Sequence, residues 1–266
     1  MGKRPVFAPA TRGKTRQFGV VRLEIEDPSS VALFLDLDGT LFDITAVPAD
    51  VSAPAGLSAT LDQLQRTLGG ALAILTGRKI DEVDRLLAPA RIAAAGVHGA
   101  ELRLQPNGAI EVTSASVPES LVRAVDRLAS SIPGVLVEHK GIAITVHYRA
   151  VPAMEPLLET ELRNLLDAHD TRLVLSHGRR VLELMPQAST KATALERFMR
   201  EPPFRGRRPV MIGDDLPDET ALATAVTLGG TALKVAGEHF RGGESDFAGP
   251  KQVRRWLEDL AMVLER

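Results

Sequence analysis

Two aspartates directly follow a short apolar segment of the chain. Residues 31–35 read Val-Ala-Leu-Phe-Leu, and Asp36 and Asp38 come next, before Gly39 and Thr40. An apolar run of this length that ends in a glycine-containing turn is typical of a buried strand. A carboxylate at the end of a buried strand is costly unless it is paired, hydrogen-bonded or bound to a metal. The segment therefore predicts a site that other parts of the chain complete.

The same arrangement recurs later in the chain. Residues 208–212 read as a strand and end in Gly213, Asp214 and Asp215, with Asp218 one helical turn further on. If the two strands lie side by side in a parallel sheet, four or five carboxylates crowd one cleft, and their repulsion calls for a cation. Mg²⁺ is the simplest choice, because it prefers oxygen ligands and often binds through one or two carboxylates and a substrate phosphate.

The elements between residues 31 and 100 alternate between strand and helix. Strand patterns cover residues 31–39, 71–78 and 91–99, and amphipathic helix patterns cover residues 56–70, where Ser58 is a candidate N-cap, and 79–89. Apolar strands joined by helices predict a parallel sheet that is covered on both faces. The chemistry of such sheets lies at the carboxyl ends of the strands, where Asp36, Thr76 and His98 fall.

The pattern changes from about Glu101. Hairpin and helix patterns follow in the order hairpin 101–114, helix 118–130, hairpin 134–150, helix 154–168 and hairpin 173–186. Strand pairs between single helices indicate an α+β unit with an antiparallel sheet. The parallel pattern resumes with helix 191–201, strand 208–215, helix 218–226, an apolar stretch at 230–236 and helix 250–265, where we expect the one tryptophan to pack in the core. We therefore predict an α/β fold with a doubly wound, Rossmann-like core (29–105 and 187–266) and an inserted α+β cap (106–186).

The composition is that of a globular protein without extreme charge. The 266 residues are 44% hydrophobic and 25% charged, include no cysteine and carry a formal net charge of −2. The lack of cysteine suits a cytoplasmic protein, the apolar runs are far shorter than the roughly 18 residues of a membrane span, and the net charge favours no nucleic-acid partner. Residues 1–28 are predicted to be a flexible basic arm. Its basic residues include Lys3, Arg4, Arg12, Lys14 and Arg16.

A second group of residues suits a phosphate. Thr76 and Gly77, and Lys191 behind Ser189 and Thr190, offer hydroxyls, backbone N–H groups and a cation close to the start of a helix. Together with an aspartate nucleophile and a metal, they describe phosphoryl transfer through an aspartyl-phosphate. Each of these motifs alone is weak, whereas all of them in this order, at strand ends, are hard to reach by chance.

This order of motifs resembles the haloacid dehalogenase superfamily of phosphatases. The corresponding motifs are Asp-Leu-Asp-Gly-Thr at 36–40, Leu-Thr-Gly-Arg at 75–78, Lys191, and Gly-Asp-Asp-Leu-Pro-Asp-Glu at 213–219. Residues 94–101, 137–149 and 178–186 are similar to the trehalose-6-phosphate phosphatase family, particularly its bacterial members. The resemblance extends from about residue 31 to the C-terminus. It implies Mg²⁺-dependent hydrolysis of trehalose 6-phosphate to trehalose and phosphate by a monomer, and a functional pairing with a trehalose-phosphate synthase.

The resemblance implies a role for each motif residue of the core. Asp36 is the nucleophile, and Asp38 protonates the leaving sugar oxygen and then activates water. The residues that bind Mg²⁺ are Asp36, Asp38 through its backbone carbonyl, and Asp214. The residues that hold the phosphate are Thr76, Gly77, Arg78 and Lys191. The residues that orient Lys191 and metal-bound waters are Asp215 and Asp218.

The resemblance also places sugar recognition in the inserted cap. The implied sugar-binding residues are Glu138, Lys140 and Glu183, with His147 and Arg149 as further candidates. Carboxylates accept hydrogen bonds from sugar hydroxyls, and an ammonium donates to them. Without the resemblance, Glu138 and Lys140 fit a solvated hairpin face with an ordinary cross-strand pair. A structural role that braces the cap is the alternative for His98, His147, Tyr148 and Arg149.

Several positions depart from the family pattern. Thr76 stands where serine is usual and keeps the hydroxyl, and Pro217 replaces a threonine at a helix start, where proline is tolerated. Gln187 and Ala192, near the lysine motif, replace arginine and glycine and remove one positive charge, which is expected to lower affinity or rate.

Two alternative functions stay open. One is a phosphatase for another phosphosugar, such as sucrose 6-phosphate or mannosyl-3-phosphoglycerate, and the other is a non-catalytic sugar-phosphate sensor. For an enzyme, we expect the cap to close about hinges at 101–105 and 186–189.

Overall fold

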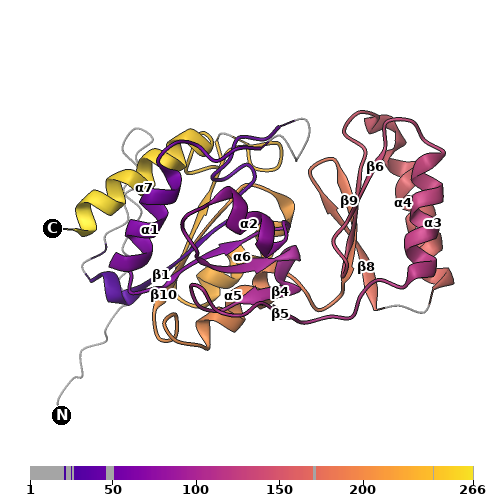
Figure 1. The fold of residues 1–266 in the computed structure, drawn as a ribbon. Helices are drawn as coiled ribbons and strands as arrows, with labels where there is room; N and C mark the ends of the chain where they lie inside the picture. Colours follow the sequence, from indigo (N-terminus) through magenta and orange to yellow (C-terminus); the bar gives the residue numbers. More distant parts are fainter. Residues whose placement is uncertain are drawn as a thin grey trace, which may run out of the picture.

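The computed structural model describes residues 21, 25, 27–45, 51–169, 172–241 and 243–265. The basic side chains named for the N-terminal arm lie outside the described residues. The described chain forms two β-sheets with flanking helices, and the two sheets lie side by side (Figure 1). Among these residues, no helix combines the length and the apolar composition that crossing a membrane requires.

Within the described chain, seven strands form the first sheet, in the order β11-β10-β1-β2-β3-β4-β5. The parallel strands are β1 (Val31–Leu35), β2 (Leu72–Leu75), β3 (Ala93–Gly96), β10 (Arg208–Gly213) and β11 (Thr231–Lys234), and β4 (Glu101–Arg103) and β5 (Glu111–Val112) add an antiparallel edge. The order of strands along the chain reverses between β1 and β10. Ligands bind such sheets at this switch point, and Asp36 and Asp214 follow these two strands.

Helices cover both faces of this sheet, as the alternating pattern predicted (Figure 1). On one face lie α1 (Leu57–Thr67), α2 (Ile80–Leu86) and α7 (Pro250–Leu264), and on the other lie α5 (Lys191–Met199) and α6 (Leu216–Thr227). Alternate residues of β1 face the two layers, since Leu33 and Leu35 pack with the first group and Phe34 packs with the second. Burial on both faces explains the continuous apolar runs, and the predicted doubly wound α/β core is confirmed.

A second, antiparallel sheet has the strand order β6-β7-β9-β8. Its strands are β6 (Leu136–His139), β7 (Ile144–His147), β8 (Leu173–Gly178) and β9 (Val181–Pro186), and its helices are α3 (Glu119–Ser130) and α4 (Glu155–Ala168). Ile144, Leu182 and Leu184 pack against these two helices. Because side chains alternate along a strand, Thr145 and Glu183 lie on the opposite face of this sheet. The two helices cover the face that points away from the first sheet (Figure 1). Short 3-10 helices are η1 (Pro28–Ser30), η3 (Val97–Gly99) and η4 (Pro152–Met154).

Tertiary packing contradicts the local prediction for Ser58 and agrees with the prediction for Trp256. Ser58 does not cap α1, because the cap position is Gly56 and the Ser58 hydroxyl donates to the Leu87 carbonyl (2.6 Å). A neighbouring loop therefore satisfies this hydroxyl in place of the helix terminus. Trp256 packs in the core as predicted, with its ring edge-on to Phe247.

The hairpin at residues 101–114 belongs to the first sheet. Its second strand, β5, lies inside the range predicted for the cap but pairs with β4. Arg103 on β4 is fully buried and donates to both Asp84 oxygens (2.6 and 2.7 Å) and to the Ile92 carbonyl (2.7 Å). This packing does not favour a hinge at residues 101–105, because the chain leaves the first sheet only after β5. The hairpin pattern itself does not say which sheet a hairpin joins.

Candidate active site

A cavity of about 460 Å³ lies between the two sheets. The residues that line it on the side of the first sheet include Asp36, Asp38, Thr76, Gly77, Arg78, Lys191, Asp215 and Asp218. The residues that line it on the side of the second sheet include Glu138, Lys140, His147, Arg149 and Glu183. The cavity therefore joins the predicted phosphate site to the predicted sugar site.

Lys191 connects two buried carboxylates. It begins α5, where Thr190 caps the helix. Its Nζ donates to Asp36 Oδ1 (2.6 Å) and to Asp218 Oδ1 (2.7 Å). The exposed fractions of the Asp36, Lys191 and Asp218 side chains are 6%, 5% and 0%. The helix start thus delivers an ammonium to the carboxylate that follows the central strand.

Asp214 lies against the turn that follows β1. The Thr40 hydroxyl donates to Asp214 Oδ1 (3.0 Å), and Asp218 Oδ2 accepts the backbone N–H groups of Asp214 and Asp215 (3.1 Å each). Gly39 has a φ of 90°, and a Cβ there would overlap the Asp214 carboxylate, so glycine is required on both counts. The sequence predicted no site role for Thr40, although this residue stands in the first motif.

Asp36, Asp214 and Asp218 form a group with excess negative charge. Each can place a carboxylate oxygen within 4.8 Å of the others, and Lys191 brings one positive charge to the three. Burial raises the pKa of Asp36 well above its usual range, and the charges of Asp218 and Asp214 add to this effect against the opposing charge of Lys191. Burial and the Asp218 charge raise the pKa of Asp214 to about 7. Buried oxygen donors with unbalanced charge fit a hard divalent cation such as Mg²⁺.

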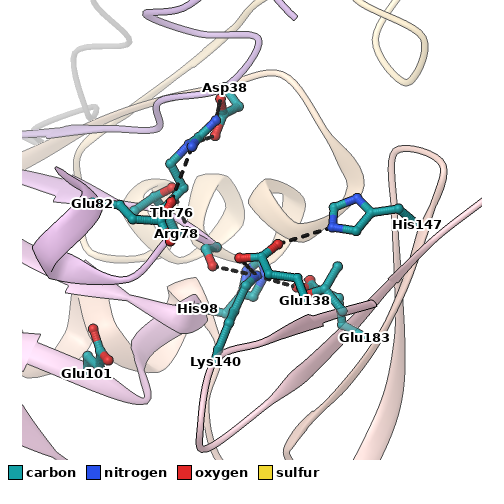
Figure 2. Close-up of polar contacts among 12 residues, drawn as sticks. Asp38, Thr76, Arg78, Glu82, His98, Glu101, Glu138, Lys140, His147 and Glu183 are labelled. Atoms are coloured by element: carbon teal, nitrogen blue, oxygen red, sulfur yellow. Dashed lines mark hydrogen bonds and ion pairs between the residues drawn. The ribbon is translucent and has the colours of Figure 1, made fainter. Parts of the chain in front are cut away.

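Asp38 is bonded to Arg78 at one side of the cavity. The Arg78 Nε and Nη2 donate to the two Asp38 oxygens (2.7 and 2.8 Å), and its Nη1 donates to Glu82 (3.3 Å) (Figure 2). A guanidinium that donates to both oxygens of a carboxylate fixes the orientation of that carboxylate. The Arg78 backbone N–H donates to the Thr76 hydroxyl (3.2 Å). Glu82 was missed by the sequence predictions, and its only signal is its place four residues after Arg78 at the start of α2.

Glu183 on β9 is the centre of the charged group on the second sheet. Its Oε1 accepts from Lys140 Nζ (3.0 Å) and from the Thr145 hydroxyl (2.7 Å), and its Oε2 is bonded to His98 Nε2 (2.7 Å). Lys140 also donates to the Gly77 backbone carbonyl (2.8 Å). Because Lys140 is buried, the alternative of a solvated hairpin face is wrong for this residue.

The carboxylates of this second group are each bonded to neighbouring side chains. Burial acts to raise the pKa of Glu183, but Lys140 and His98 hold it well below its usual range. Burial likewise acts to lower the pKa of Lys140, but Glu183 and Glu138 raise it. Glu138 Oε2 is bonded to His147 Nε2 (3.1 Å), and this bond, with the charge of Lys140, lowers the pKa of Glu138 against the effect of burial. Both glutamates and the lysine are therefore charged at neutral pH.

Two predicted site residues bond to the backbone near the cavity. The Asp215 carboxylate caps α6 by accepting from the Leu216 N–H (2.8 Å), whereas Lys191 bonds with Asp36 and Asp218. Arg149 donates to the Thr45 backbone carbonyl. Pro217 lies in the first turn of α6, where its tolerance was predicted. Further residues that line the cavity, to which the sequence analysis gave no site role, include Ile44, Val51, Arg85, Leu136, Arg179 and Val181.

The strand order, the aspartates after β1, the lysine that begins α5 and the acidic motif after β10 define the class of protein. Its fold is shared by a solved phosphatase and a solved hydrolase of the haloacid dehalogenase superfamily.

Within that class, the chain belongs to the trehalose-phosphatase family, whose profile matches residues 34–252. A probable trehalose-phosphate phosphatase of Sinorhizobium fredii is 40% identical over 210 residues, which cover 79% of each chain. A trehalose-6-phosphate phosphatase of Escherichia coli is 36% identical over 239 residues, which cover 88% of each chain. The C-terminal domain of a C. albicans trehalose-6-phosphate phosphatase shares the fold with a TM-score of 0.73 at 20% identity, over 88% of this chain and 92% of that chain. The protein is accordingly a phosphoric monoester hydrolase.

Proposed function

We propose that this protein hydrolyses trehalose 6-phosphate to trehalose and phosphate, with Mg²⁺ as its cofactor, through a phosphoryl group carried on Asp36. The observation that carries the proposal is the single cavity that joins the Asp36–Lys191 pair to the Glu183–Lys140 pair. The first pair suits a phosphate and the second suits a group with several hydroxyls, so a sugar phosphate fits the whole cavity. The relatives named for this substrate support the choice of sugar.

The chemistry proceeds in two displacements at phosphorus. An Asp36 oxygen attacks the phosphorus, and the bond from phosphorus to the sugar oxygen breaks while Asp38 gives that oxygen a proton. Asp38 then takes a proton from the water that attacks the aspartyl-phosphate, which releases phosphate and restores the Asp36 carboxylate. Arg78 donates to both Asp38 oxygens, so in this mechanism it turns to the phosphate when substrate binds and leaves Asp38 able to carry a proton. Lys191 and the Thr76–Gly77 turn bind the remaining phosphate oxygens.

The metal would be held by the Asp36 and Asp214 carboxylates and the Asp38 backbone carbonyl. The fit rests on the excess of buried carboxylates over cations in this group. When bound, Mg²⁺ supplies positive charge that offsets the charge of the phosphoryl oxygens. Asp218 supports the site by bonding Lys191 (2.7 Å), and Asp215 supports it by capping α6.

The second sheet and its helices act as a cap over the sugar. We assign residues 29–105 and 187–266 to the catalytic core and residues 106–186 to the cap, with β5 paired to the core sheet. Glu138, Lys140 and Glu183 bind sugar hydroxyls, and His147 and Arg149 complete the same side of the cavity. Closure of the cap excludes bulk water from the reacting phosphate. The enzyme acts as a cytoplasmic monomer on the product of a trehalose-phosphate synthase.

A substrate panel tests this function. Phosphate release by the purified full chain is measured with trehalose 6-phosphate, sucrose 6-phosphate and mannosyl-3-phosphoglycerate, each with Mg²⁺ or with EDTA. We expect kcat/KM for trehalose 6-phosphate to exceed the others by at least about 100-fold, because a mismatched sugar leaves buried polar groups unpaired, and we expect EDTA to remove the activity. Faster hydrolysis of another sugar phosphate would show that this compound, and not trehalose 6-phosphate, is the substrate. If calorimetry shows binding of trehalose 6-phosphate and no phosphate is released, the alternative of a non-catalytic sugar-phosphate sensor is favoured.

A further inference from the structure

His98 stands in a strained turn between β3 and β4. Val97 and His98 have φ angles of 46° and 54°, and Gly99 follows with a φ of 107°. Left-handed backbone is costly for residues other than glycine, and most of all for a β-branched residue such as valine. The surrounding structure must therefore hold this turn in place, and the turn aims the His98 ring at the second sheet.

The turn contacts both parts of the phosphate site. The His98 backbone N–H donates to the Thr76 carbonyl (3.0 Å). A Cβ on Gly77 would lie 2.7 Å from His98 Nε2, and a Cβ on Gly99 would lie 2.9 Å from the carbonyl oxygen of Thr190, the residue before Lys191. The two glycines therefore allow the turn to pack directly against the Thr76–Gly77 turn and against the start of α5.

A continuous series of hydrogen bonds runs from His98 through the sugar site and back to the phosphate site. His98 is bonded to Glu183 Oε2, Glu183 Oε1 accepts from Lys140, and Lys140 donates to the Gly77 carbonyl. The Gly77 carbonyl and the Arg78 N–H belong to one planar peptide unit, and that N–H donates to the Thr76 hydroxyl (3.2 Å). The orientation of Glu183 is thereby linked to the orientation of a hydroxyl that binds phosphate.

We propose that His98 is a positioning residue that couples sugar recognition to the phosphate site. By holding Glu183 Oε2, it directs Glu183 Oε1 toward Lys140, and Lys140 then fixes the peptide that positions the Thr76 hydroxyl. A sugar bound to Glu183 and Lys140 stabilises this series of bonds, so turnover is fast only for a phosphate ester that carries the sugar. This inference rests on the proposed function, because it assigns the sugar to Glu183 and Lys140.

The variant His98→Asn tests the coupling. Asparagine tolerates left-handed backbone, but its side chain is too short to reach Glu183. We expect kcat with trehalose 6-phosphate to fall by about 30-fold, as for a misplaced reactive group, with KM changed less. Turnover of p-nitrophenyl phosphate should change by less than about two-fold, because this substrate has no sugar to stabilise the series of bonds.

Two further variants separate positioning from a general structural role. His98→Gln keeps an N–H within reach of Glu183 and should restore kcat to within about three-fold of the wild type. His139→Asn is the matched control, because His139 is 43% exposed and pairs with Asp126 (3.0 Å), and it should leave both substrates unaffected. Equal losses with both substrates in His98→Asn, or no rescue by His98→Gln, would overturn the coupling.

Variants of Thr145 decide the question if His98→Asn does not fold. Thr145→Val removes the hydroxyl that donates to Glu183 Oε1 (2.7 Å), whereas Thr145→Ser keeps it. We expect the first variant alone to lower kcat with trehalose 6-phosphate while p-nitrophenyl phosphate turnover stays constant, and equal behaviour of the two variants would refute the coupling. A wild type that hydrolyses p-nitrophenyl phosphate but not trehalose 6-phosphate would instead remove the proposed function.

Discussion

The two sheets each bury a group of charged side chains, and the two groups differ in how their charges balance. Beside the first sheet, Asp36, Asp214 and Asp218 share the single ammonium of Lys191. The pKa values of Asp36 and Asp214 rise as a result of burial and of repulsion from Asp218. This group is electrostatically incomplete, and it gains stability from any cation that binds it.

The group on the second sheet is complete without a ligand. Glu183 is bonded to Lys140 and His98, and its pKa falls well below the usual range although its side chain is equally buried. A buried carboxylate that is already bonded to a lysine can exchange hydrogen bonds with a neutral sugar without admitting an additional ion. This difference indicates that the group around Lys191 is suited to a metal and a charged phosphate, whereas the group around Glu183 is suited to neutral hydroxyls.

The largest expected effect is that of Asp36→Asn. Loss of the attacking carboxylate should lower phosphate release by at least about 1,000-fold, while the melting temperature should stay constant or rise because one repelling charge disappears. Asp43→Asn, a change at an exposed carboxylate shortly after Asp36 in the chain, is the matched control and should change neither quantity. Retained turnover would remove Asp36 from the nucleophile role, and a lower melting temperature would contradict the excess of negative charge.

The substitution Glu183→Gln should act in the opposite direction on stability. It removes the nearer of the two carboxylates that pair with the buried Lys140, which costs about 3 kcal/mol of unfolding free energy. We also expect kcat/KM with trehalose 6-phosphate to fall by about 100-fold. Urea unfolding and phosphate release measure the two effects, with Glu159→Gln on α4 as the control. A variant as stable as the wild type would show that the second group is no more balanced than the first.

Acid should affect the two groups with opposite signs. The pKa of Glu183 lies well below its unfolded value of about 4.5, so its contribution to stability is complete above about pH 5 and is lost as the pH falls through the folded pKa. The pKa of Asp36 is raised, so protonation of Asp36 on acidification relieves repulsion. Urea unfolding of the wild type and of Glu183→Gln should therefore differ by a constant amount down to about pH 5 and converge below it. A difference that does not shrink between about pH 5 and pH 3 would contradict the lowered pKa of Glu183.

The smallest effect is expected for Asp215→Ala. Loss of the N-cap of α6 should lower the free energy of unfolding by about 1 kcal/mol, and kcat should stay within about three-fold of the wild type because Lys191 bonds with Asp36 and Asp218. Asp215→Ser keeps a capping oxygen and should behave as the wild type. A larger fall in kcat for Asp215→Ala alone would assign this carboxylate a direct part in the phosphate site.

Local patterns were sufficient for most of the fold. The strands at 31–35 and 72–75 and the hairpin at 134–150 were predictable because hydrophobic periodicity and turn residues are properties of short segments. The predicted boundary at residues 105 and 106 divided the hairpin at 101–114 between the core and the cap, and only its pairing with β3 places the whole hairpin in the first sheet. Ser58 was a candidate N-cap because it stands near the start of a helix pattern. Nothing in the local sequence indicates that its hydroxyl donates to the distant Leu87 carbonyl.

The motif residues of the candidate site could be predicted from the sequence, but the hydrogen bonds between distant residues could not. Asp36, Thr76, Lys191 and Asp214 stand in local motifs, whereas the bond from Thr40 to Asp214 joins residues 174 positions apart. The bond from His98 to Glu183 likewise joins residues 85 positions apart. No short-range pattern specifies such a pair.

The sequence by itself determined which chemical groups are present at the strand ends and, through the order of strands and helices, that they meet at one edge of a parallel sheet. Only the tertiary structure decided how their charges balance. Glu183 and Asp36 are both buried carboxylates bonded to a lysine, yet their pKa values move in opposite directions. The physical reason is that a pKa depends on burial and on the distances to every neighbouring charge, and these distances are set by how the two sheets pack.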